Sequence, residues 1–72
     1  MPRYARISAL RREAALYQKN IAELLECAQQ TYSDYERGAL DIPTEVLIRL
    51  ADYYHTSTDY ILGRTNHRDA LP

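Results

Sequence analysis

Two short helical patterns, separated by only a few residues, fill the stretch of the chain over residues 18–38. The first pattern places Ile21, Leu24 and Leu25 at the i, i+3, i+4 spacing of an amphipathic helix. The second pattern carries tyrosines on one face and polar side chains on the opposite face. Two helices joined by so short a connection predict a helix-turn-helix.

The second helix of this pair has an outward face that is suited to hydrogen bonding with bases. At about 100° per residue, Tyr32 and Tyr35 fall on one side of the helix and the polar positions on the other. The polar positions are Gln29, Gln30, Ser33, Asp34 and Arg37. A glutamine amide can bond the N6 and N7 edge of adenine bidentately, so this face is typical of a recognition helix. Short amphipathic helix pairs also occur in bundles that never contact DNA.

Several residues fall in the register of one known family. In the helix pair these residues are Gln18, Ala22, residues 26–28, Gln29, Gln30, Tyr35, Glu36 and Gly38, and later in the chain they are residues 42–43, 50–54 and 59–65. Over about residues 4–65 the chain therefore resembles the Cro/C1-type, XRE-like, helix-turn-helix transcriptional regulators. The resemblance implies an all-α fold, a compact five-helix lambda-repressor-like DNA-binding domain with its helix-turn-helix at helices 2 and 3.

A chain of 72 residues has room for one domain. We expect that domain at residues 1–65 and a flexible C-terminal tail at residues 66–72, where apolar periodicity is absent. Helix 1 is predicted over about residues 4–15, and its inward stripe comprises Ile7, Leu10 and Ala14. The chain contains seven tyrosines and no Phe or Trp. Because each buried tyrosine hydroxyl needs a partner, we expect the tyrosines at the edge of the core.

The helix pair departs from the family at both of its N-cap positions. Tyr17 and Ala28 stand where relatives usually carry Thr or Ser, and each missing side-chain cap is predicted to cost about 1 kcal/mol. Glu26 takes the turn position that is usually a glycine. A left-handed Glu26 would place backbone strain in the turn.

Positive charge is concentrated at the amino-terminal end of the chain, although the net charge is −1. Residues 1–19 hold five cations against Glu13 alone, whereas residues 20–72 hold four cations against nine acids. The net charge counts against DNA binding, because nonspecific affinity comes mainly from cations placed against phosphate. The uneven distribution allows a basic end to face a polyanion and an acidic face to meet solvent or a protein partner.

The polar positions of the helix pair are assigned roles in DNA binding. Gln29 and Gln30 are expected to read bases, while Thr31 and Ser33 contact a thymine methyl, a base edge or a phosphate. The residues expected to hold the DNA backbone are Gln18, Lys19 and Arg37. Asp34 is expected to bring a repulsive negative charge onto the same surface.

Arg11 and Glu36 each project from the border of an apolar stripe, Arg11 on helix 1 and Glu36 on helix 3. This position predicts an ion pair that links the two helices, and the family resemblance implies the same pair. The alternative is two exposed charges, which contribute roughly 0–1 kcal/mol if they meet.

Nothing in the sequence indicates an enzyme, a cofactor or a metal site. Cys27, His55 and His67 do not have the spacing of metal ligands, and Cys27 is interpreted as a packing residue. A glycine-rich phosphate loop and a nucleophile with an adjacent base are both absent from the sequence. One cysteine agrees with a reducing compartment, and no apolar run reaches the length of a membrane span. We predict a cytoplasmic, nucleoid-associated bacterial protein that is not an enzyme and does not contact a membrane.

These observations predict a sequence-specific DNA-binding transcriptional regulator. It would insert helix 3, at about residues 29–37, into the major groove of double-stranded DNA as a homodimer. Repression is favoured over activation because occupying a promoter needs no further domain. The alternative is a protein-interaction or antitoxin-like module that keeps the fold with weak DNA affinity. Asp34 favours this alternative, as do Ala39 and Leu40, which stand where relatives often carry Lys or Arg.

Overall fold

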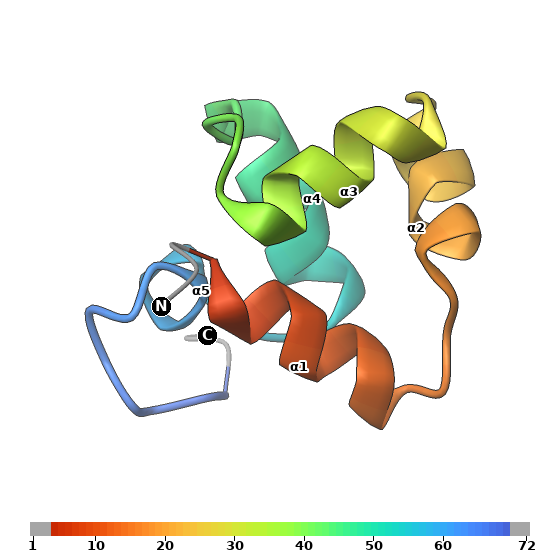
Figure 1. Cartoon of the computed structure of the whole chain (residues 1–72). Helices are drawn as coiled ribbons and strands as arrows, with labels where there is room; N and C mark the ends of the chain where they lie inside the picture. The colour runs from red at the N-terminus through yellow and green to blue at the C-terminus, as the bar shows by residue number, and fades with distance from the viewer. Residues whose placement is uncertain (1–3, 70–72) are drawn as a thin grey trace.

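Five helices follow one another in the computed structural model, which describes residues 4–69 (Figure 1). They are α1 (Ala5–Glu13), α2 (Gln18–Leu25), α3 (Gln29–Arg37), α4 (Thr44–Tyr53) and α5 (Thr58–Ile61). The described part of the chain contains no strand. The predicted all-α fold is confirmed, and α2 and α3 lie where the sequence placed the helix-turn-helix.

The core receives a fully buried side chain from every helix. The largest of these side chains are Ile7, Leu10, Ile21, Tyr32, Leu50 and Ile61. Helices of only four to ten residues are marginal in isolation. Each one is therefore stabilised mainly by burying its apolar face in the shared core, at roughly 1.5–3 kcal/mol for a fully buried large side chain.

The expectation that the tyrosines lie at the edge of the core is wrong for Tyr32. Its side chain is completely buried at the centre of the core, where α3 packs on its neighbours. Within residues 4–69 the buried hydroxyls of Tyr32 and Tyr54 have no hydrogen-bond partner. Because the chain has no Phe or Trp, a tyrosine fills the core position that such a side chain would otherwise take. Burial also raises the pKa of Tyr54 to about 12. Tyr4 is also buried, and its hydroxyl accepts the N–H of Ile42 at 3.3 Å.

All five helices end in the same way, with one left-handed residue after the last turn. These residues are Ala15, Glu26, Gly38, His55 and Gly63. At each end two N–H groups bond back to carbonyls of the last turn, in the pattern of a Schellman motif. Only two of the five positions are glycines, so the remaining three hold a conformation that side chains rarely adopt.

Helix α1 is shorter than the sequence predicted. It ends at Glu13, and Ala14, which was expected to face inward, is exposed. The cause is the left-handed Ala15, which turns the chain so that the N–H of Leu16 bonds the carbonyl of Arg11 at 3.1 Å. Leu16 then packs against the core in place of Ala14.

Arg6 of α1 binds α5 and the segment that follows it. Its guanidinium lies 4.2 Å from the ring centroid of Tyr60 and donates to the carbonyl of the same residue at 2.8 Å. It also donates to the carbonyl of Thr65 and, at 2.7 Å, to Oδ1 of Asn66. One side chain therefore holds α1, α5 and the following segment together.

The segment after α5 makes a second connection to α1 through Arg68, whose guanidinium lies 2.8 Å from the carboxylate of Glu13. The hydroxyl of Thr56 donates to the carbonyl of Arg68. The flexible tail predicted for residues 66–72 stays a prediction, and its last three residues lie outside the described part of the chain. No helix between residues 4 and 69 is long and apolar enough to cross a membrane.

Candidate nucleic-acid interface

The two faces of α3 differ as the helical wheel predicted. Tyr32 and Tyr35 are buried, whereas Gln29, Gln30 and Arg37 are exposed. The remaining candidates on this helix, Thr31, Ser33 and Asp34, are half-buried. The helix therefore presents a polar ridge to solvent along one side and is anchored through two aromatic rings on the other.

The turn between α2 and α3 is built around a left-handed glutamate. Glu26 has φ 56° and ψ 40°, and it ends α2 where the sequence predicted strain. The N–H of Cys27 closes the turn by donating to the carbonyl of Ala22 at 3.0 Å, and Cys27 packs against the core as expected. This turn sets the direction in which α3 leaves α2.

The two N-caps of the helix pair differ. Ala28 offers no side-chain cap to α3, as the sequence predicted. Helix α2 has a compensating contact that the sequence reasoning missed, because Oδ1 of Asn20 accepts the N–H of Tyr17 at 2.8 Å. An Asn three residues after an N-cap is the signal that could have revealed this contact, since it can reach back as in a capping box.

Glu36 joins α3 to α1 through a two-point contact with Arg11. The Nε of Arg11 lies 2.7 Å from Oε2 of Glu36, and its Nη2 lies 3.1 Å from Oε1. These distances match the pair expected from the sequence. The side chains are only 12% and 6% exposed, so this is a buried ion pair rather than two surface charges. Arg11 also donates to the carbonyl of Leu16 at 3.0 Å, which ties the end of α1 to the same point.

Gln18 completes this joint from α2, because its Nε2 donates to Oε1 of Glu36 at 3.1 Å. Gln18 was predicted to contact the DNA backbone alone, and its hydrogen bond to Glu36 was not predicted. Burial alone raises the pKa of Glu36, but the hydrogen bonds from Arg11 and Gln18 oppose this effect, and the pKa lies below its ordinary value. The carboxylate is therefore charged at neutral pH and connects three helices.

A second carboxylate on α3, Asp34, binds the two exposed side chains beside it. The Nε2 of Gln30 donates to Oδ1 of Asp34 at 2.9 Å, and Arg37 donates to the same oxygen. Hydrogen bonds from Arg37 and Gln30 lower the pKa of Asp34. Asp34 was predicted to be only a repulsive charge on this surface. In the structure it orients Gln30, a predicted base-reading side chain, and neutralises Arg37, a predicted backbone contact.

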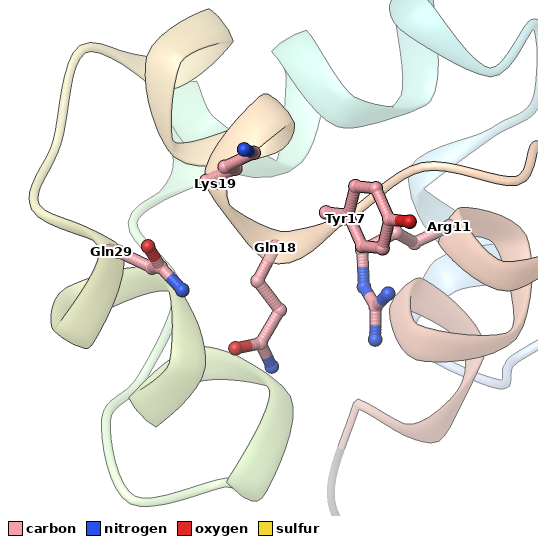
Figure 2. A pocket seen from close by; sticks show the side chains of 5 residues that line it. All are labelled: Arg11, Tyr17, Gln18, Lys19 and Gln29. Carbon is pink, nitrogen blue, oxygen red and sulfur yellow. The ribbon is translucent and has the colours of Figure 1, made fainter.

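Gln18, Lys19 and Gln29 meet around a shallow hollow at the start of α2 and α3, which Arg11 and Tyr17 also line (Figure 2). In this view Gln18 lies between Gln29 of α3 and Arg11 of α1. The ammonium of Lys19 is 5.9 Å from the ring centroid of Tyr17, an exposed side chain. The predicted base-reading and backbone-binding residues at this end are therefore side by side.

Two of the four cations described between residues 4 and 19 are used inside the fold. Arg6 and Arg11 bond internal acceptors, and Arg3 lies outside the described residues. Between residues 4 and 19, Arg12 and Lys19 are the cations whose side chains make no hydrogen bond or ion pair within the described part of the chain. Among residues 4–69, no three His, Cys, Asp or Glu side chains gather where they could hold a metal ion.

A family model described as a helix-turn-helix domain matches residues 5–60, which cover α1 to α4 and most of α5. The chain belongs to the helix-turn-helix domain family. The matched residues include the helix pair, the buried ion pair and every candidate DNA contact. The family membership that the sequence motifs indicated is thus confirmed.

Three proteins of Bacillus subtilis (strain 168) are similar to this helix-turn-helix chain. The HTH-type transcriptional regulator ImmR is 39% identical over 59 residues, which are 82% of this chain and 46% of ImmR. The uncharacterized HTH-type transcriptional regulator YobD is 36% identical over 64 residues, 89% of this chain and 57% of YobD. The HTH-type transcriptional regulator AnsR is 34% identical over 67 residues, 93% of this chain and 58% of AnsR. The chain spans about half the length of these relatives.

Proposed function

We propose that this protein is a sequence-specific DNA-binding transcriptional regulator that inserts α3 into the major groove. The observation that carries the proposal is the pair of exposed amides, Gln29 and Gln30, on a helix whose opposite face is fixed by buried tyrosines and an ion pair. A recognition helix needs this rigidity, because base edges are distinguished by the placement of single donors and acceptors. The names of the three relatives support the same function.

The candidate residues divide into base-reading and backbone-binding groups. Gln29 and Gln30 read bases, and Thr31 and Ser33 contact a base edge, a thymine methyl or a phosphate. Lys19 contacts the backbone beside the first turn of α2, whose free N–H groups also suit a phosphate. Gln18 and Arg37 hold the backbone only with those donor hydrogens that Glu36 and Asp34 leave free.

We further propose that residues 1–65 bind DNA as a homodimer, with two copies of α3 in successive major grooves, and that residues 66–72 act as a tail. Two-fold operators and two-fold proteins match in this geometry. We also propose that this protein represses by occupying a promoter and that it acts in the cytoplasm at the bacterial nucleoid. Neither catalysis nor a cofactor has a place in this function.

A second candidate function is a protein-interaction or antitoxin-like module with weak DNA affinity. Asp34 favours it, because this carboxylate already neutralises Arg37 on the surface that would face DNA. Leu40 also favours it, since its side chain is 44% exposed just after α3, where a cation would serve DNA better. In this function the acidic face would meet a protein partner. Weak retention on heparin at low salt would support the second candidate over the first.

Selection of bound sequences from a random double-stranded DNA pool tests the proposed function. The purified protein is expected to enrich one motif whose half-sites lie about one helical turn apart. The variant in which both glutamines are replaced, Gln29→Ala with Gln30→Ala, keeps the fold because both side chains are exposed, and it serves as the matched control. A pool without enrichment by the wild-type protein would contradict sequence-specific binding.

A further inference from the structure

A hollow of about 420 Å³ lies between α1 and α3, next to the one at the start of the helix pair. Ser8 and Arg12 line it from α1, and Ser33 and Arg37 line it from α3. Each pair is spaced i, i+4, so its two side chains lie on one face of their helix. Two helices therefore direct hydroxyl and guanidinium groups into the same open space.

Three of these groups are free to bind a ligand. Within residues 4–69, Ser8, Arg12 and Ser33 make no side-chain hydrogen bond, ion pair or ring contact. The hydroxyls are half-buried, and Arg12 is exposed. A serine hydroxyl donates one hydrogen bond and a guanidinium offers five N–H donors, so the group of side chains suits an anion with several acceptor oxygens.

Each carboxylate around the hollow is paired with an arginine, so none of them adds an unpaired negative charge that would repel an anion. Glu36 at its wall is bound by Arg11, Asp34 is bound by Arg37, and Glu13 beside Arg12 is bound by Arg68. Arg12 is therefore the uncompensated charge of this surface.

We propose that this hollow binds a phosphate of the DNA backbone through Arg12 and the hydroxyls of Ser8 and Ser33. The inference rests on the proposed function and adds a backbone contact from α1, which the sequence reasoning left out. The hollow shares Gln18 with the one that Lys19 and Gln29 line, so the two hollows adjoin each other. If one base of a DNA strand contacts Gln29, the neighbouring phosphates of that strand would lie along this surface.

Salt-dependent binding titrations of Arg12→Ala test the proposal against Arg64→Ala. Both changes remove one positive charge, but Arg64 is exposed and lines neither hollow. For Arg12→Ala the slope of log K against log salt is expected to become shallower by about 0.9, the value for one phosphate contact. Affinity should fall roughly five- to tenfold at low salt, equally on selected and random DNA. Arg12→Lys should restore most of the slope, and Arg64→Ala should leave it unchanged.

A titration with inorganic phosphate tests the anion site independently of DNA binding. It is followed by the NMR chemical shifts of backbone amides and arginine side chains. The signals of Ser8, Arg12 and Ser33 are expected to move in the wild-type protein and to stay in place in Arg12→Ala. If the wild-type protein binds selected DNA but Arg12→Ala has the same salt slope and affinity as Arg64→Ala, the phosphate site is overturned and the proposed function stands. If the wild-type protein binds no DNA, the function falls, and an absence of phosphate shifts at these residues would overturn the anion site as well.

Discussion

Helix α3 carries two carboxylates two residues apart, and each accepts hydrogen bonds from one arginine and one glutamine. Glu36 faces inward and binds Arg11 of α1 and Gln18 of α2, so its partners come from other helices. Asp34 faces outward and binds its own neighbours on the helix, Gln30 and Arg37.

The same three functional groups therefore serve two different purposes. In the buried group they fix where α3 lies, because removing one partner would leave a charge without water or a counter-ion. In the exposed group they set the orientation of surface side chains, since water replaces any bond that is lost and the energy at stake is small. Burial, rather than the identity of the residues, decides which purpose applies.

Arg11→Ala is expected to have the largest effect on the free energy of unfolding. The change leaves the carboxylate of Glu36 without its counter-ion, although the side chain is only 6% exposed. The free energy of unfolding should fall by about 3–5 kcal/mol. Arg37→Ala breaks the exposed pair with Asp34 and should cost much less, because water replaces the lost bond. Chemical denaturation of both variants provides the comparison. Equal losses would show that burial does not separate the two groups.

Acid should weaken the fold mainly through Glu36. Its pKa in the folded protein lies below the reference value of 4.5, so its contribution is complete above about pH 4.5 and is lost as the pH falls through the folded pKa. Denaturation between pH 7 and pH 3 measures this loss, and Glu36→Gln should flatten the profile. The control Asp34→Asn should change it less, although the pKa of Asp34 is lowered too, because that carboxylate is hydrated. A profile that Glu36→Gln leaves unchanged would contradict this account.

Ala28→Ser is expected to stabilise the domain by about 1 kcal/mol, which is less than the loss expected for Arg11→Ala. Ala28 has the extended backbone of an N-cap residue, and its side chain offers α3 no acceptor. Thermal melts should show a rise of several degrees for a domain of this size. Ala39→Ser adds the same hydroxyl beyond the other end of the helix and is the control. Equal shifts would mean that capping is not the cause.

The fold followed from the sequence because apolar spacing and short connections define the helix pair without tertiary information. The end of α1 was harder to predict, because Ala15 adopts a left-handed conformation that its residue type does not signal. This conformation accompanies the packing of Leu16, the residue that follows, against the core.

Parts of the candidate site were predictable for a similar reason. The helical wheel separates Gln29 and Gln30 from the buried tyrosines, so the exposed face could be read from the chain. The contacts of Gln18 with Glu36 and of Gln30 with Asp34 depend on rotamers and on distances between side chains. One of them crosses between helices, and sequence spacing carries no information on that crossing.

We propose that the outward face of α3 recognises DNA bases, while its inward face only holds the helix in place. Fluorescence titrations on the selected motif and on random DNA test it directly, with Gln29→Ala, Gln30→Ala and Asp34→Asn beside the wild-type protein. Each glutamine variant should lose about 1–3 kcal/mol on the motif and little on random DNA. Asp34→Asn should bind random DNA more tightly, because a negative charge leaves the surface. Equal losses on both DNAs for Gln29→Ala and Gln30→Ala would contradict the claim and remove α3 as the reader.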